Sequence, residues 1–134
     1  MLGKQNQAHV VLHPAETFDP PGDISLVFTS PPYFSTEVYG GSDEQSARKY
    51  SSFDKWLDGF LQPIIKTAYW VLPVGGRLVL NVNDIRQQGK ILPLVAETKS
   101  LALGTGFTWE DTLVMPIAPL NGARTGEPVL VFRK

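Results

Sequence analysis

A candidate hydrogen-bond acceptor site is formed by four consecutive residues: Ser30, Pro31, Pro32 and Tyr33. Because proline has no backbone N–H, the two prolines fix the backbone and leave carbonyl oxygens free to accept hydrogen bonds from another molecule. The serine adds a hydroxyl acceptor, and the tyrosine ring offers a flat face for a planar heterocycle. This SPPY motif therefore predicts a rigid site for a planar group that carries an amino function.

The chemistry that such a site suits is methylation of an exocyclic amino group on cytosine or adenine. That nitrogen is a poor nucleophile because its lone pair is delocalised into the ring. If the Ser30 hydroxyl and the Pro31 carbonyl each accept one amino hydrogen, the nitrogen is drawn toward tetrahedral geometry, which is catalysis by positioning and electrostatics. A base must leave the duplex to reach this site, and we expect Tyr33 or Phe34 to stack against it.

The elements around the motif predict where it lies. Residues 24–29 are apolar and β-branched, and residues 9–12 form a second apolar run, so both are expected to be buried strands. Residues 30–52 are polar and interrupted by glycine and proline, which is typical of a functional loop. Ligands of open α/β sheets bind beyond the carboxyl ends of the strands, which is the place of the motif.

Downstream, helical and strand patterns alternate. Ser51 and Asp54 fit a capping box, and apolar residues follow at helical spacing as far as Leu72, with Pro63 expected to kink or break this helix. The other expected elements are a strand at 78–82, a helix from 91 to about 103, and strands at 107–117 and 128–132. This order favours an α/β layered domain with parallel early strands and a C-terminal antiparallel hairpin. Asn83 and Asp84 either line the site or cap the next turn.

Composition narrows the class of protein. The 134 residues are 43% hydrophobic, contain no cysteine and carry a net charge of -1. We expect one soluble, cytoplasmic domain without disulfides and without a metal site, since His9 and His13 have no acidic or histidine partners at metal spacing. The small net charge argues against tight DNA binding by the chain alone. Arg48 and Lys49 in the long loop are candidates for phosphate contacts, or ordinary surface charges.

Residues 24–34 resemble the motif shared by S-adenosylmethionine-dependent DNA amino-methyltransferases of the adenine-N6 and cytosine-N4 type. The resemblance continues through Tyr50, Trp56, Phe60, Leu72, Gly75, Gly76, residues 78–84 and residues 127–134. It implies a Rossmann-like class I methyltransferase fold, DNA as substrate, and a role in restriction-modification. It also implies catalytic and base-holding roles for the SPPY motif, and it places Glu16 and Ser30 near the cofactor. The serine is commoner among cytosine-N4 enzymes, but adenine-N6 enzymes use it too, so the target base stays open.

One element of that family is missing. The Phe-x-Gly-x-Gly turn that holds the methionine part of the cofactor has no counterpart here, because Gly75 and Gly76 precede a strand and Gly104 and Gly106 follow a helix. We therefore expect residues 1–134 to be an incomplete domain, the C-terminal catalytic part of such an enzyme. A cofactor-binding half or a second copy of the chain should complete it.

Two other functions remain open. The same acceptor site could hold an RNA base or a glutamine side chain, although proteins of that kind usually have asparagine at the place of Ser30. The chain could also be a catalytically silent binding module, which the near-neutral charge and the missing glycine turn favour over an independent enzyme. In the leading hypothesis, the loop at 34–52 orders around the target base while Arg48 and Lys49 contact phosphates.

Overall fold

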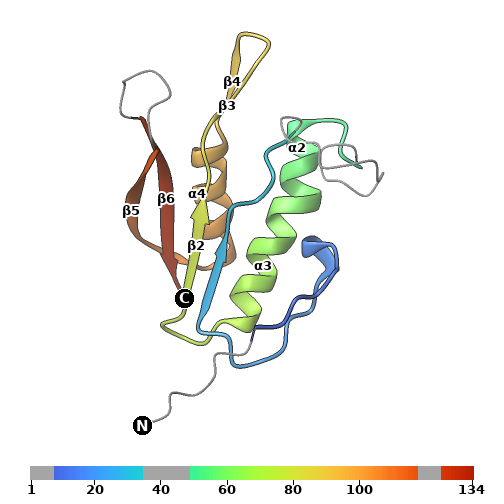
Figure 1. Ribbon diagram of the computed structural model, residues 1–134, viewed down its shortest axis with the longest axis vertical. Coiled ribbons are helices and arrows are strands. Elements are labelled where there is room, and N and C mark those ends of the chain that lie inside the picture. Colours follow the sequence, from blue (N-terminus) through green and yellow to red (C-terminus); the bar gives the residue numbers. More distant parts are fainter. Residues whose placement is uncertain (1–7, 35–48, 118–124) are drawn as a thin grey trace.

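The computed structural model describes residues 8–34, 49–117 and 125–134 (Figure 1). Its centre is a four-stranded sheet in the order β1 (Leu26–Thr29), β2 (Arg77–Asn81), β6 (Thr125–Arg133) and β5 (Thr108–Ile117). β1 and β2 are parallel, whereas β6 runs antiparallel to both of its neighbours. The predicted parallel start and C-terminal hairpin are confirmed.

A helical layer follows β1 in the chain. It begins with α2 (Phe53–Trp56), passes through a π-helical turn, η2 (Leu57–Leu61), and continues as α3 (Gln62–Val71). The Ser52 hydroxyl accepts a hydrogen bond from the backbone N–H of Lys55, so the cap lies one residue after the predicted Ser51. The long amphipathic helix predicted from the apolar spacing is therefore present, with a π-helical turn inside it.

The π-helical turn has a local cause at Pro63, where a kink or break was predicted. Proline cannot donate to the carbonyl of Gly59, four residues earlier, so that oxygen loses its usual helical partner. The Tyr50 hydroxyl donates to it instead, at 2.6 Å. A side chain at position 59 would collide with the Tyr50 ring, so the glycine permits this approach. Tyr50 thereby lets the helix continue past the proline.

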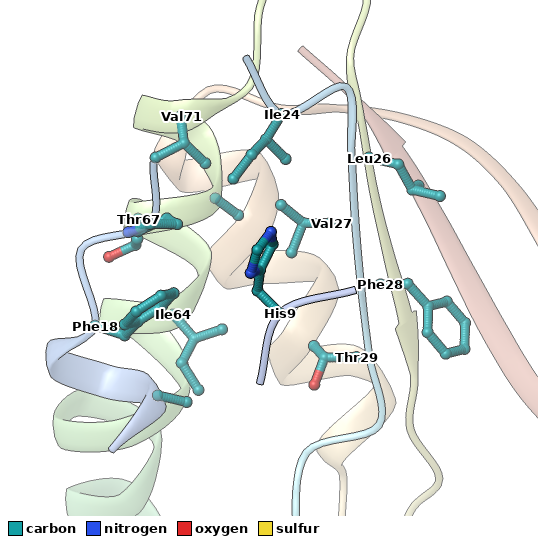
Figure 2. Close-up of a pocket in the computed structure, with 13 residues that line it drawn as sticks. His9, Phe18, Ile24, Leu26, Val27, Phe28, Thr29, Ile64, Thr67 and Val71 are labelled. Atoms are coloured by element: carbon teal, nitrogen blue, oxygen red, sulfur yellow. The ribbon is translucent and has the colours of Figure 1, made fainter. Parts of the chain in front are cut away.

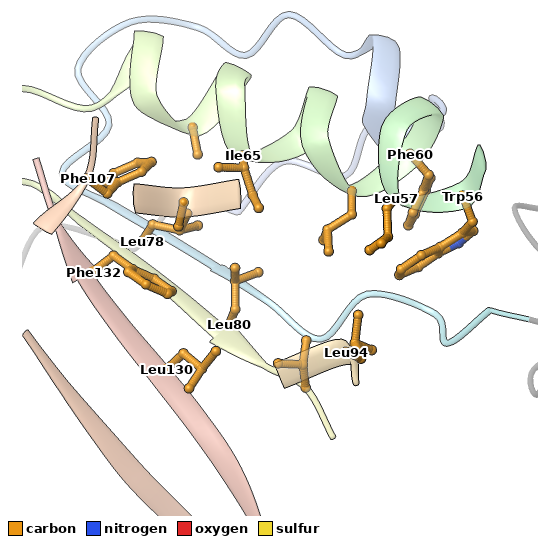
Figure 3. Packing of buried hydrophobic residues seen from close by; sticks show 14 of the residues in the cluster. Trp56, Leu57, Phe60, Ile65, Leu78, Leu80, Leu94, Phe107, Leu130 and Phe132 are labelled. Atoms are coloured by element: carbon orange, nitrogen blue, oxygen red, sulfur yellow. The ribbon is translucent and has the colours of Figure 1, made fainter. Parts of the chain in front are cut away.

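One face of the sheet is covered by helices. α3 and α4 (Leu94–Thr105) contact one another and share one core with alternate residues of β2 and β6 (Figure 3). The strand residues that face this layer are fully buried: Leu78, Leu80, Leu130 and Phe132. This core joins the two helices to the middle of the sheet.

The opposite face, which we call the bare face, carries no helix within the described part of the chain. Its apolar residues on the two edge strands are half-exposed, at 55% for Leu26, 62% for Phe28, 52% for Leu113 and 41% for Met115. Between them lie Val129 and Val131 of β6, which are buried by their neighbours in the sheet. The sheet is thus apolar on both faces but covered on one.

The predicted strand at residues 9–12 is wrong. These residues pair with no strand, and Val10 and Leu12 are 98% and 102% exposed. A short apolar run becomes a strand only when a neighbouring strand supplies hydrogen bonds and another layer covers its side chains. The described chain provides neither, and β1 remains an edge strand of the sheet.

A small hairpin that no sequence pattern had predicted separates β2 from α4. It consists of β3 (Ile85–Gln87) and β4 (Lys90–Leu92), joined through Gln88 and Gly89 at φ values of 50° and 74°. Because β4 occupies residues 90–92, α4 begins at Leu94 and not at the predicted position 91. It ends at Thr105, and the C-cap residue that follows, Gly106, has a φ of 121°, which suits glycine.

Candidate active site

The SPPY motif begins directly after β1 ends, at the carboxyl end of a strand that is parallel to β2. Ser30 is exposed, Pro31 is buried, and Pro32 and Tyr33 are half-buried. The motif therefore passes from the surface at its serine toward the helical layer. An exposed serine followed by a packed proline is the arrangement that the predicted acceptor role requires of these two residues.

Phe34 lies in the core and not in an open site. Its ring is 8% exposed and lies 6.1 Å from the Phe53 ring and 6.5 Å from the Trp56 ring, measured between centroids. These contacts hold the end of the motif against α2. The arrangement does not support the predicted stacking of Phe34 on a base, because its ring is already enclosed by two aromatic neighbours. Tyr33, which packs only partly against the core, is the other predicted stacking residue.

Two predicted site residues from distant parts of the chain form an ion pair. Lys49 Nζ lies 3.0 Å from Glu16 Oε1, and the Glu16 side chain is 6% exposed. The hydrogen bond to Glu16 raises the pKa of Lys49 above its ordinary value. Glu16 was expected to bind the cofactor and Lys49 to contact DNA phosphates. In the structure the two side chains bind each other instead. Arg48, the neighbouring predicted phosphate contact, lies outside the described residues.

Asn83 and Asp84, for which two roles were left open, fasten the end of β2 to α4. Asp84 Oδ1 accepts a hydrogen bond from the backbone N–H of Val95 at 3.0 Å, in the first turn of the helix. Asn83 Oδ1 accepts from the backbone N–H of Asp84 at 2.9 Å. Since Pro93 at the helix start gives no side-chain cap, the Asp84 carboxylate takes that role. The structure supports the capping alternative.

Asn81, at the end of β2, was not among the predicted site residues. It is 6% exposed, and its Nδ2 donates to Glu127 Oε2 at 3.3 Å and approaches Met115 Sδ at 3.9 Å. Its Oδ1 is buried without a hydrogen-bond partner in the described chain. In the sequence, Asn81 could have been noticed as a polar residue within the apolar run that forms β2.

A groove of about 650 Å³ runs beside the free edge of β1 (Figure 2). The segment before β1 and the side of α3 form its other walls, and its lining is mainly apolar. Val27 and Thr29 point toward α3, whereas Leu26 and Phe28 point to the other side of the strand. The groove is lined by Thr29 but by no residue of the SPPY motif, so it is a feature of the sheet edge and not the acceptor site itself.

Two kinds of feature are absent from the described residues. No three histidine, aspartate or glutamate side chains gather there in a group able to hold a metal ion. No helix in those ranges is long and apolar enough to cross a membrane.

Known proteins match this chain over most of its length. Residues 24–134 match the family model described as DNA methylase. The type II methyltransferase M.MjaVI of Methanocaldococcus jannaschii is 32% identical over 95 residues, which are 71% of this chain and 46% of that protein.

Solved structures of a DNA methylase also resemble this chain in fold. A putative DNA modification methylase from Thermus thermophilus has a TM-score of 0.67 at 26% identity, over 92% of this chain and 52% of that one. The same methylase complexed with S-adenosyl-L-methionine gives a TM-score of 0.63 at 24% identity, over 90% and 53%. The Rossmann-like methyltransferase fold is thus confirmed, and the chain spans about half the length of the relatives it matches. From residue 24 to residue 134, this chain belongs to the DNA methylase family.

Proposed function

We propose that this chain is the catalytic part of an enzyme that transfers a methyl group from S-adenosylmethionine to the exocyclic amino group of adenine (N6) or cytosine (N4) in DNA. The observation that carries the proposal is the SPPY motif at the carboxyl end of β1, in a chain of the DNA methylase family. A methylase neighbour with a closely similar fold is a complex with S-adenosyl-L-methionine. The alternatives of an RNA base or a glutamine side chain receive no support from this family.

The residues of the motif have separate tasks in this mechanism. The Ser30 hydroxyl oxygen and the Pro31 carbonyl each accept one hydrogen of the target amino group, which frees the nitrogen lone pair for attack. Pro32 holds the backbone rigid, and Tyr33 stacks on the flipped base. When bound, the cofactor supplies an electrophilic methyl group on its sulfonium. The nitrogen that gains this methyl group then loses one proton to solvent.

The described residues fit the base-holding part of this reaction better than the cofactor-holding part. Ser30 is exposed at the strand end, as an acceptor for the amino group must be. Glu16, the candidate for holding the cofactor, is already bound to Lys49, so a cofactor hydroxyl or amino group has to compete with that lysine. Release of Lys49 would leave a half-exposed cation able to reach a DNA phosphate, together with Arg48.

We infer that the rest of the cofactor site comes from a part that this chain does not contain. The relatives are about twice as long as the region they share with it. Among the described residues, no strand pairs with the outer edge of β1, and the bare face beside it exposes Leu26 and Phe28. Sheets of α/β proteins are usually covered on both faces, so a cofactor-binding half is expected to add to this edge and cover this face. A second copy of the chain is the other candidate.

The bare face and free edge also favour a second function, that of a catalytically silent subunit which binds a partner methylase. Such a subunit would need the same contacts along β1 but no intact acceptor site. A substitution in the SPPY motif should therefore slow methyl transfer if this chain is catalytic, and should leave the rate unchanged if the chain only binds a partner.

Substitution of Ser30 separates these functions in the assembled enzyme. We expect Ser30→Ala to slow single-turnover methyl transfer to DNA by at least about tenfold, or ~1.4 kcal/mol in the barrier, because the amino group loses one acceptor. Ser100→Ala, at an exposed position of α4, is the matched control and should leave the rate unchanged. Mass spectrometry of the digested DNA identifies the methylated base. Equal rates for the two variants would contradict a catalytic role for the motif.

A further inference from the structure

Ser30 follows the last residue of β1, and Asn81 is the last residue of the parallel strand β2. The ladder between β1 and β2 pairs Phe28 with Val79 and Thr29 with Leu80, so its next step places position 30 beside position 81. Phe28 points away from α3, and Val27 and Thr29 point toward it (Figure 2). The alternation of side chains along a strand then puts both Ser30 and Asn81 on the side of the bare face.

The Asn81 amide is held in one orientation. Its Nδ2 donates to a carboxylate oxygen of Glu127 at 3.3 Å and lies 3.9 Å from the Met115 sulfur. An ionised carboxylate only accepts hydrogen bonds, so turning the amide over would bring two oxygens together. The contact with Glu127 therefore directs Oδ1 of Asn81 away from β6.

That Oδ1 atom is a buried acceptor without a donor in the described chain, in a side chain that is 6% exposed. Buried polar groups are nearly always paired, and an unpaired acceptor in a native protein calls for an explanation. Here the unpaired acceptor lies at the end of β2, next to the end of β1, where the SPPY motif begins. A donor that arrives or turns only during function would explain it.

The proposed reaction needs such an acceptor. For the oxygen of the Ser30 hydroxyl to accept an amino hydrogen of the base, its own hydrogen must point elsewhere. We propose that Oδ1 of Asn81 accepts this hydrogen when the base is bound, so that Asn81 orients Ser30 and Glu127 orients Asn81. Asn81 is then a positioning residue that acts through Ser30. This inference rests on the proposed function and goes beyond it by adding a second strand to the site.

A double-mutant cycle in the assembled enzyme tests the proposal. We expect Asn81→Ala to lower the single-turnover rate of methyl transfer by about tenfold, a loss typical of one hydrogen bond, with little change in DNA affinity. In the Ser30→Ala background, Asn81→Ala should have no further effect, because the hydroxyl it orients is gone. A structural role would instead add its full loss in both backgrounds, and that additive result would overturn the proposal.

A further variant and a control complete this test. Glu127→Gln, which can donate as well as accept, should permit the amide to turn over and should lower the rate in the same non-additive way. Ser100→Ala, the exposed control in α4, should leave the rate unchanged in both backgrounds. If Ser30→Ala itself leaves the rate unchanged, the proposed function fails. If only the Asn81 and Glu127 variants match the wild type, the proposed function stands and this inference fails.

Discussion

Both faces of the sheet carry apolar residues, but the two faces lie in opposite environments. On the helix side, Leu80 of β2 and Phe132 of β6 are fully buried beneath α3 and α4. On the bare face, Leu26 and Phe28 of β1 are more than half exposed, at 55% and 62%. Apolar side chains point to both sides of these strands, which is typical of a sheet that is covered on both faces. One face therefore holds the fold of this chain together, while the apolar side chains of the other face remain accessible in the described chain.

The largest expected effect comes from a matched pair of phenylalanines on the two faces. Phe132→Ala should destabilise the chain by about 3–5 kcal/mol, because it leaves a cavity in the core between the sheet and the helices. Phe28→Ala should cost less than about 1 kcal/mol in the chain alone, because its ring is 62% exposed. Urea unfolding of both variants measures the difference. Similar losses would mean that the bare face also supports the fold of the isolated chain.

A charge on the bare face should affect association more than folding. We expect Phe28→Asp to weaken binding of the complementary half, or of a second copy, by at least about tenfold, or ~1.4 kcal/mol, because a carboxylate would be buried against apolar side chains. Lys66→Asp, on an exposed position of α3, is the control and should not alter association. Sedimentation velocity over a range of concentrations measures the association of both variants. Association that is identical in the two would show that another surface is the interface.

The covered side of the molecule was largely predictable from the sequence. The amphipathic spacing that ends at Leu72 predicts the long helix, and β-branched runs bounded by turn residues predict β1, β2 and the C-terminal hairpin. These elements follow from local periodicity. The run at residues 9–12 shows the limit of such patterns, because apolar residues alone do not reveal whether a neighbouring strand is present.

The position of the candidate site was predictable from the sequence, but the contacts around it were not. The position of the SPPY motif followed from the strand before it. The pairing of Asn81 with Glu127 joins residues 46 positions apart, and that of Glu16 with Lys49 joins residues 33 positions apart. Such contacts depend on strand register and on the packing of distant segments, neither of which local pattern or composition contains. The three-residue strands β3 and β4 were missed because they are too short to show a period.

The smallest expected effect concerns an ion pair at one end of the bare face. Arg77 of β2 holds Glu110 of β5 through two hydrogen bonds, from Nε at 2.6 Å and from a terminal guanidinium nitrogen at 2.9 Å. The side chains are 49% and 33% exposed, so solvent screens the pair. The hydrogen bond from Arg77 lowers the pKa of Glu110 below its ordinary value of 4.5.

The sign of the pH dependence follows from that direction. Since the folded chain holds Glu110 ionised to a lower pH than the unfolded chain does, the pair stabilises the fold fully above the unfolded pKa. The contribution is lost as the pH falls from about 5 through the lowered folded pKa. We expect the urea midpoint of Glu110→Gln to lie slightly below that of the wild type at pH 7 and to converge with it under acidic conditions. Arg77→Gln should give the same convergence, and the double variant should add nothing at either pH. A gap that stays constant down to pH 3 would mean that the variants act by changing the packing of β5 on the bare face and not through the charge of Glu110.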